Sequence, residues 1–295
     1  MAEKEKRRGF INVVLVLSLI AFVGFSIAPL WNMMTANRTP SEGATATSTP
    51  AINIQQTELE KQVQGYQLVL QREPDNQTAL RGVLEAQLQL LQMGQGDIQA
   101  IISPLEKLSQ LNPDQTDYAI LLAQVKEQAA DAEGAAQTYR SILSAQPGNI
   151  AALEGLVNLL LGQQRPEAAI GLLQDTLKAA PQANQVEAGS IDVVSVQLIL
   201  GKVYASQQRY EEAIAVYDEA TKVDDQDFRP PLGKAIVLQQ QGQSETAQSF
   251  FDKSLELAPA SYRDQIQQLA QGQPQTPATS EPQPSATETP PSESE

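Results

Sequence analysis

The sequence predicts an all-α protein in which an N-terminal transmembrane helix precedes a right-handed solenoid of stacked helical hairpins. Three observations predict this fold class. An uncharged apolar run lies near the N-terminus, the middle of the chain is rich in the helix-favouring residues Ala, Leu and Gln, and prolines recur there at a fixed period. The expected segments are a basic N-terminus (1–9), the transmembrane helix (10–34), a flexible linker (35–57), the helical array (58–271) and a disordered tail (272–295).

The apolar run from Phe10 to Trp31 contains 22 residues and no charged side chain. As a helix it would rise about 33 Å, enough to cross a hydrocarbon core of about 30 Å. Four basic residues lie within 4–8, whereas only Arg38 follows closely, so we expect a cytoplasmic N-terminus and an array on the periplasmic or lumenal side. A cleaved signal peptide is the alternative, and Pro29 after the small-residue sequence disfavours it.

The segments flanking the array differ from it in composition. Thr35–Pro50 is rich in Thr, Ser and Pro, which predicts a flexible tether. Residues 272–295 contain six prolines, and their only charged side chains are acidic, which predicts disorder, with a proline-motif ligand as the alternative.

Composition excludes several classes of function. The chain has no His and no Cys, which removes the usual zinc ligands, the imidazole base of hydrolase triads and thiol nucleophiles. Its net charge of −15 argues against nucleic acid as a partner. Asp224, Asp225 and Asp227 lack the spacing of a calcium loop and indicate a turn between repeats. We therefore predict no catalytic residue, no cofactor and no metal; chemistry by carboxylates alone is the enzymatic alternative.

The period of the middle section is 34 residues. Pro113, Pro147 and Pro181 are each 34 residues apart, and the same interval separates Asp225 from Pro259. A 34-residue unit in an all-helical pattern predicts stacked helix-turn-helix hairpins.

Each unit also repeats a small, a large and a second small-to-medium side chain at i, i+4 and i+7 of its second helix, which places them on one stripe. These triplets are Ala135, Tyr139 and Ile142; Ala169, Leu173 and Thr176; Ala213, Tyr217 and Ala220; and Ala247, Phe251 and Ser254.

This pattern resembles the tetratricopeptide repeat family over roughly residues 58–270. The unit most similar to the family pattern has Leu200, Gly201, Tyr204, Ala213, Tyr217 and Ala220. We expect a lone helix of the second type at 58–71, five hairpins and a capping helix at 262–270. The first helices are expected to start near Thr78, Thr116, Ile150, Ile191 and Pro231, and the second helices near Ile98, Glu133, Pro166, Tyr210 and Ser244. The insertion 182–190 is expected as a surface loop or an extension of the first helix of its unit.

The resemblance implies that the first helices line a groove that binds partners. Mapped onto this sequence, the groove residues are Arg81, Glu85, Asp117, Leu121, Gln124, Glu154, Asn158, Leu198, Lys202, Arg229 and Ile236. The mixture is not strongly of one sign, and it suits a helix or extended segment held by apolar contacts and amide hydrogen bonds. Glu154, Gly155 and Ile199 stand where a grip on a terminal carboxylate would need donors, which argues against that grip.

The combination of anchor, tether and array predicts a membrane-tethered scaffold or assembly factor that binds client proteins or peptides. The plan resembles the anchored tetratricopeptide proteins of cyanobacteria and chloroplasts that assist photosystem assembly. The alternative is a translocon-associated or envelope-assembly factor in a bacterial periplasm. The client, the membrane and the oligomeric state stay open at this point.

Overall fold

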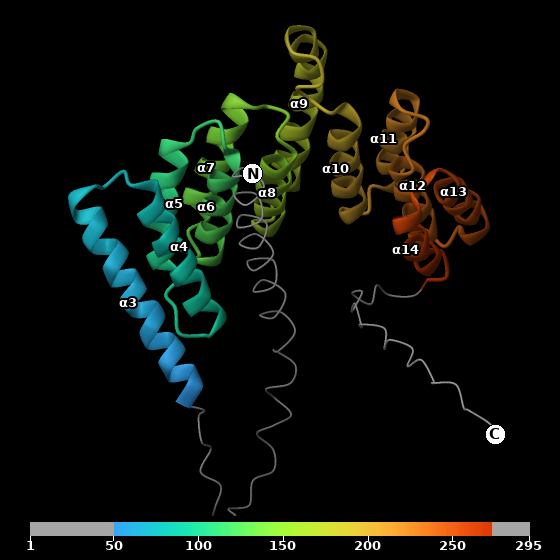
Figure 1. The fold of residues 1–295 in the computed structure, drawn as a ribbon. Coiled ribbons are helices and arrows are strands. Elements are labelled where there is room, and N and C mark those ends of the chain that lie inside the picture. Colours follow the sequence, from blue (N-terminus) through green and yellow to red (C-terminus); the bar gives the residue numbers. More distant parts are fainter. Residues whose placement is uncertain (1–49, 273–295) are drawn as a thin grey trace, which may run out of the picture. The chain divides into compact units, whose positions relative to one another are not determined.

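The computed structural model describes residues 50–272, which form twelve α-helices and no strand (Figure 1). The all-helical prediction is confirmed across this range. None of the helices described there combines the length and the apolar character that a membrane crossing requires. The predicted transmembrane helix and the predicted tail after residue 272 lie outside the described residues.

The chain forms two compact units, which divide between residues 196 and 197 inside α10 (Val193–Ser206). The helices up to that one are α3 (Pro50–Arg72), α4 (Gln77–Gln92), α5 (Gln99–Leu111), α6 (Thr116–Gln128), α7 (Ala132–Ala145), α8 (Ile150–Gly162) and α9 (Pro166–Val186). The remaining helices are α10 (Val193–Ser206), α11 (Tyr210–Val223), α12 (Arg229–Gln240), α13 (Ser244–Leu257) and α14 (Ala260–Ala270).

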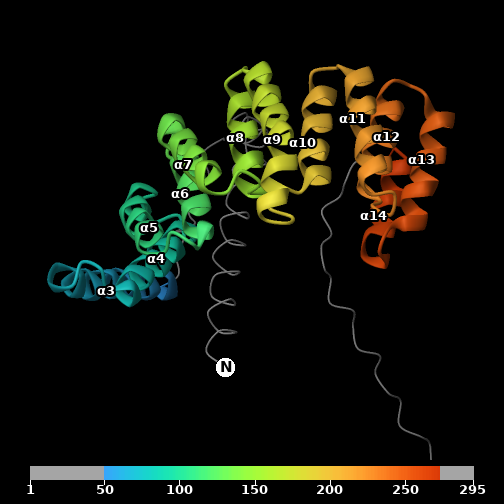
Figure 2. The same cartoon turned by 90° about the horizontal axis from the view of Figure 1, so that it is seen from above.

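Consecutive helices pack against each other from α3 to α9 in unit 1 and from α11 to α14 in unit 2, as Figure 2 shows for each unit. The first helices of the five hairpins are α4, α6, α8, α10 and α12, and the second helices are α5, α7, α9, α11 and α13. α3 is a lone helix of the second type, and α14 caps the other end of the array. Every predicted start of a first or second helix lies within two residues of the observed one.

The turn inside each hairpin uses a residue in the left-handed conformation, which is Gly94 with a φ of 70° in the first hairpin and one of the following four residues in the others. Ala130, Gln164, Gln208 and Gly242 have φ values of 61°, 58°, 59° and 76°. In the turn after α6, the amide of Asp131 donates to the carbonyl of Lys126 at 2.8 Å, a bond that closes the helix end. Three of these four positions carry a side chain where glycine would be less strained.

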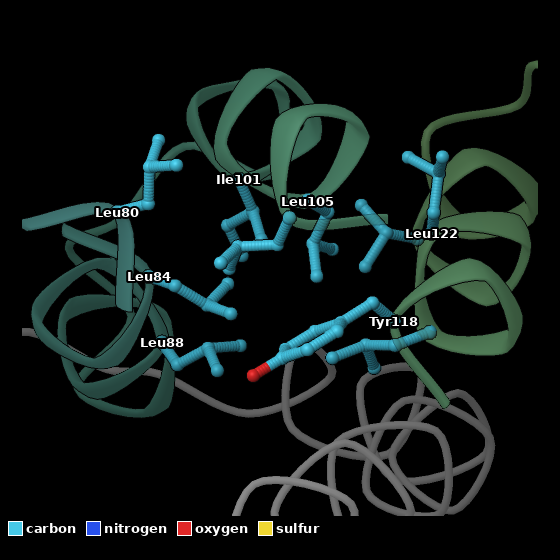
Figure 3. Packing of buried hydrophobic residues seen from close by; sticks show 10 residues of the cluster. Leu80, Leu84, Leu88, Ile101, Leu105, Tyr118 and Leu122 are labelled. Atoms are coloured by element: carbon cyan, nitrogen blue, oxygen red, sulfur yellow. The ribbon is translucent and has the colours of Figure 1, made fainter. Parts of the chain in front are cut away.

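Apolar side chains from neighbouring hairpins form the core of each unit. In unit 1, Leu84, Ile101, Leu105 and Tyr118 pack together from α4, α5 and α6 (Figure 3). In unit 2 the core includes Phe251 of α13, which is 1% exposed, beside residues of α12 and α14. No hairpin encloses a core alone, so packing between neighbours stabilises the array.

The predicted boundary between linker and array was wrong. α3 begins at Pro50 rather than at Glu58, so residues 50–57 belong to a helix and not to the linker. Proline is tolerated at the first helical position because its missing N–H would be unpaired there anyway. Residues 51–57 contain neither Gly nor Pro, so nothing stops the helix from continuing into the array.

Pro181 does not end its helix. Residues 182–186 of the insertion extend the second helix of the preceding unit rather than the first helix of the next, and residues 187–190 form a loop, which was the other expectation. α9 continues through Pro181 to Val186. The loop that follows is fixed by Asn184, which donates to the carbonyl of Ile191 at 2.9 Å and accepts from the Ile191 amide at 2.9 Å. A Cβ at Gly148 would lie 2.1 Å from the Ser190 carbonyl oxygen, so the loop lies directly against the preceding turn.

Candidate protein-binding face

The first helices expose one stripe of side chains and bury the other. In α8, Glu154 and Asn158 are exposed, whereas Leu153 and Leu156 are buried in the core. Exposed positions follow each other at intervals of three and four residues, as expected for one side of a helix. α6 and α8 contact each other directly. We call the exposed stripes of neighbouring first helices the first-helix face of a unit.

Tyrosines of the second-type helices reach this face beside glycines of the first helices; Tyr139 and Tyr217 are buried, and Tyr66 is half-buried. The pairs are Tyr66 with Gly82, Tyr139 with Gly155 and Tyr217 with Gly233, each 16 residues apart. A Cβ at these glycines would lie 2.3, 2.2 and 2.7 Å from the ring, far inside van der Waals contact. Only glycine therefore lets the first helix approach the ring so closely.

The hydroxyl group of Tyr139 is held by a carboxylate. It donates to Glu127 Oε1 at 2.7 Å, and the ring is 1% exposed. Burial raises the pKa of the Glu127 carboxyl above its ordinary value, and the hydrogen bond from Tyr139 lowers this pKa in part. Burial also raises the pKa of the Tyr139 phenol, and the neighbouring carboxylate raises it further. The pair places a partly buried carboxylate between α6 and α8.

Tyr217 inserts between α10 and α12 in unit 2. Cβ atoms at Gly201 and Gly233 would lie 2.6 and 2.7 Å from its Cζ, so the end of the ring that carries the hydroxyl group lies between the two first helices. The side chain is 5% exposed, and burial raises its pKa to about 12. The phenol is therefore protonated at neutral pH and available as a hydrogen-bond donor.

The structure brings most of the predicted groove residues to the first-helix faces. Glu85, Asp117, Gln124, Glu154, Asn158, Lys202 and Arg229 are exposed, and Arg81, Leu198 and Ile236 are half-buried. Several flank the glycines that contact the tyrosines: Arg81 and Glu85 flank Gly82, Glu154 and Asn158 flank Gly155, Leu198 and Lys202 flank Gly201, and Arg229 and Ile236 flank Gly233.

Leu121 was assigned to the groove incorrectly. It is 1% exposed and belongs to the core formed by α4, α5 and α6. On a helix each residue turns by about 100°, so a shift of one position moves a side chain from the exposed stripe to the buried one.

Charge on the first helices is segregated between the units, although the predicted groove residues taken together are not strongly of one sign. The first helices of unit 1 carry the carboxylates Glu85, Asp117, Glu127 and Glu154 and the basic residues Arg81 and Lys126. In unit 2, α10 and α12 carry Lys202, Arg229 and Lys234 and no acidic residue. The face of unit 1 is therefore mainly acidic and that of unit 2 is basic and apolar.

Two of the basic side chains in unit 2 are already paired. Lys234 Nζ lies 2.6 Å from Asp218 Oδ1, and Arg229 Nη2 lies 2.6 Å from Asp227 Oδ2. Lys202 is exposed and has no ion pair within residues 50–272. It is the cation of this face that is left for a partner.

Within residues 50–272 no three acidic side chains are placed together as metal ligands. A shallow hollow beside the start of α3 is lined by residues of α3 and by Gln89 of α4, and its single carboxylate is Glu58.

Sequence reasoning missed Glu127, Tyr139 and Tyr217 as parts of this face. The signal that would have found them is the glycine that follows each tyrosine at a distance of 16 residues. Such a glycine marks where a ring touches the next first helix.

Family models match both units. A tetratricopeptide repeat model matches residues 127–188, a TPR repeat model matches residues 201–242, and a further tetratricopeptide repeat model matches residues 232–261. The repeats at residues 127–188 and 201–261 thus match the tetratricopeptide type. This confirms the repeat type expected from the 34-residue period.

Similar proteins share parts of this array. Cellulose synthase operon protein C of Pseudomonas fluorescens (strain SBW25) is 28% identical over 149 residues, which are 50% of this chain and 12% of that protein. This chain thus spans only 12% of the length of that curated relative. Yeast Tom70 is similar in structure, with a TM-score of 0.49, 14% identity and coverage of 81% of this chain and 45% of that one. TTC0263, a thermophilic TPR protein of Thermus thermophilus, has a TM-score of 0.41, 19% identity and coverage of 65% and 97%. Similarity at these identities concerns the fold alone.

Proposed function

We propose that this chain is a membrane-tethered scaffold or assembly factor that binds client proteins on the first-helix faces of its repeats. The observation that carries this proposal is the repeated exposed stripe of the first helices, at which polar and apolar side chains gather around the Tyr–Gly contacts. Arrays of helical hairpins offer extended surfaces of this kind to other proteins. The role proposed is binding, without catalysis by the chain itself.

The chemistry of the faces indicates how a client would be held. Gln124 and Asn158 offer exposed amides in unit 1, and Leu198 and Ile236 offer half-buried apolar surface in unit 2. Amides donate and accept hydrogen bonds, and apolar side chains add contact area. A helix or an extended segment of a client suits such a surface.

The apolar run from Phe10 to Trp31 supports the membrane tether, and the basic residues before it support an array on the periplasmic or lumenal side. On this proposal the linker lets the array reach clients near the membrane surface. Assembly of photosynthetic complexes is the first setting that we propose, and envelope assembly or protein translocation in a bacterial periplasm is the second.

Affinity purification from native membranes tests the binding role. The full chain is compared with a face variant, Gln124→Ala with Asn158→Ala, and with a control variant, Arg140→Ala with Lys178→Ala, whose substitutions lie on the second helices. We expect the wild type and the control to recover the same client proteins and the face variant to lose them. Recovery that is equal for all three, or no client with any, contradicts the proposal.

Protease accessibility in sealed vesicles tests the topology, with an epitope added after residue 295. When protease is added on the cytoplasmic side of vesicles of known orientation, the epitope should stay intact, because the membrane shields an array that lies in the lumen or periplasm. Digestion from the cytoplasmic side contradicts the proposed side.

A further inference from the structure

Two of the buried tyrosines occupy equivalent places in their hairpins but differ in what their hydroxyl groups meet. Tyr139 donates to Glu127, which lies twelve residues earlier. Ala205 lies twelve residues before Tyr217, and its methyl group cannot accept a hydrogen bond. The Tyr217 hydroxyl has no hydrogen-bond partner within residues 50–272, and its pKa is shifted by burial alone. A 95% buried side chain thus directs an unused donor towards the first-helix face of unit 2.

Packing does not require this hydroxyl group. The equivalent places in other hairpins are filled by Leu105, Leu173 and Phe251, each at most 1% exposed. The Tyr217 hydroxyl oxygen is not among the buried polar atoms that lack a partner in residues 50–272, so it is accessible from the surface of the face. An external acceptor can therefore reach it.

The surroundings of the Tyr217 hydroxyl define the chemistry of that acceptor. Gly201 and Gly233 touch the end of the ring. Leu198 and Lys202 flank Gly201 on the surface of α10, and neither α10 nor α12 carries an acidic side chain. The Lys202 ammonium group and the Tyr217 phenol are donors, whereas Gln197 Oε1 of α10 is a buried acceptor without a partner within the described residues. Because the one unpaired charge that the described helices α10 and α12 carry is positive, the complementary charged group is an anionic acceptor.

We propose that the α10–α12 face binds a client peptide segment that carries Asp or Glu, whose carboxylate lies between the Lys202 ammonium group and the Tyr217 hydroxyl group. Leu198 and Ile236 contact apolar side chains beside that acidic residue. A carboxylate is favoured over a nucleic acid because the chain carries a net charge of −15, which repels a polyanion. This inference rests on the proposed function, since it specifies the chemistry of the client.

Peptide selection tests the inference. The full chain, kept in mild detergent because of its apolar N-terminal run, is immobilised and screened against a display library of random peptides. Enriched peptides are expected to carry Asp or Glu next to an apolar residue. The most enriched one is then labelled, and its affinity is measured by fluorescence anisotropy.

The variants separate the two donors from the rest of the array. Lys202→Glu is expected to weaken binding about tenfold or more, because it replaces attraction by repulsion. Tyr217→Phe is expected to weaken it roughly three- to tenfold, the range for one hydrogen bond. Tyr210→Phe, which removes a hydroxyl group from the start of the second helix α11, is the matched control and should leave the affinity unchanged. Tyr217→Phe should also leave the melting temperature undiminished, which shows that its effect is on binding.

The outcomes distinguish this inference from the function on which it rests. If the library yields no binding peptide, the proposed function itself fails. If peptides bind without an acidic residue, or with equal affinity to the Lys202→Glu and Tyr217→Phe variants, the function stands and this inference is overturned. A synthetic peptide of residues 272–295 is included as a competitor. If it displaces the selected peptide at lower concentration than the peptide itself, the site belongs to the chain's own acidic segment and not to a client.

Discussion

Replacing Gly155 with alanine is expected to destabilise the array, although alanine is the better helix former. A Cβ at Gly155 would lie 2.2 Å from Tyr139 Cζ, where an ordinary carbon contact is about 3.5–4.0 Å. The ring has little freedom to move away, since it is 1% exposed and its hydroxyl group is bonded to Glu127. Overpacking of this kind costs about 1–3 kcal/mol, which exceeds the gain of up to about 1 kcal/mol from replacing glycine in a helix.

Gly171 provides the matched control. It lies inside α9, and a Cβ there would meet nothing within 4 Å. Gly171→Ala therefore gains helix propensity without a clash and should raise stability by up to about 1 kcal/mol.

Thermal unfolding of the full chain, followed by circular dichroism, measures both variants. For an array of this size, each kcal/mol corresponds to about 2–4 °C in Tm. Gly155→Ala should melt several degrees below the wild type and Gly171→Ala slightly above it. If the two variants melt at the same temperature, the ring does not contact the first helix as closely as described, and the role assigned to the Tyr–Gly pairs is wrong.

Four further substitutions test other parts of the structure. Gln164→Gly should stabilise the array by about 1 kcal/mol because its φ is 58°, and Gly242→Gln should do the reverse, as measured by urea denaturation. Glu127→Gln keeps an acceptor for the Tyr139 hydroxyl group and removes a carboxyl group whose pKa is raised on folding. The wild type should lose stability as the pH rises from about the ordinary value of 4.5 through the raised pKa, whereas the variant should keep its stability over this range. Identical pH profiles of stability for the two proteins contradict this expectation. Asn184→Ala removes both hydrogen bonds between this side chain and the backbone of Ile191, so it should speed amide hydrogen exchange in the loop that follows α9. Unchanged exchange would show that the Asn184 side chain does not hold the loop.

Much of the fold follows from the repeat itself. Each hairpin buries its apolar stripe only against neighbours of the same design, so the small and large residues recur every 34 positions and locate the helices. Pro166 illustrates this, since it was predicted at a helix start and begins α9. Features that depart from the period were harder to predict. Pro181 marks a unit end by its spacing, yet α9 runs through it into an insertion that Asn184 holds in place.

The candidate site was predicted less completely than the fold. The exposed stripe follows from helical geometry, so residues such as Asn158 were assigned correctly to the surface. Leu121 was assigned to the surface incorrectly, because its orientation depends on the register of α6 against α4 and α5. The role of a buried hydroxyl group depends on which side chain stands beside it. The difference between Glu127 and Ala205 has meaning only once both are placed next to a tyrosine ring.

Site-specific photocrosslinking in native membranes tests the binding face most directly. A photoreactive residue is placed in the full chain at Asn158 on the first-helix face of unit 1, at Lys202 on that of unit 2, or at Lys178 on the exposed side of α9. Adducts with the same client proteins are expected from a face position and not from Lys178. Adducts that form equally from Lys178, or that never form from either face, would show that clients are not bound by the first helices.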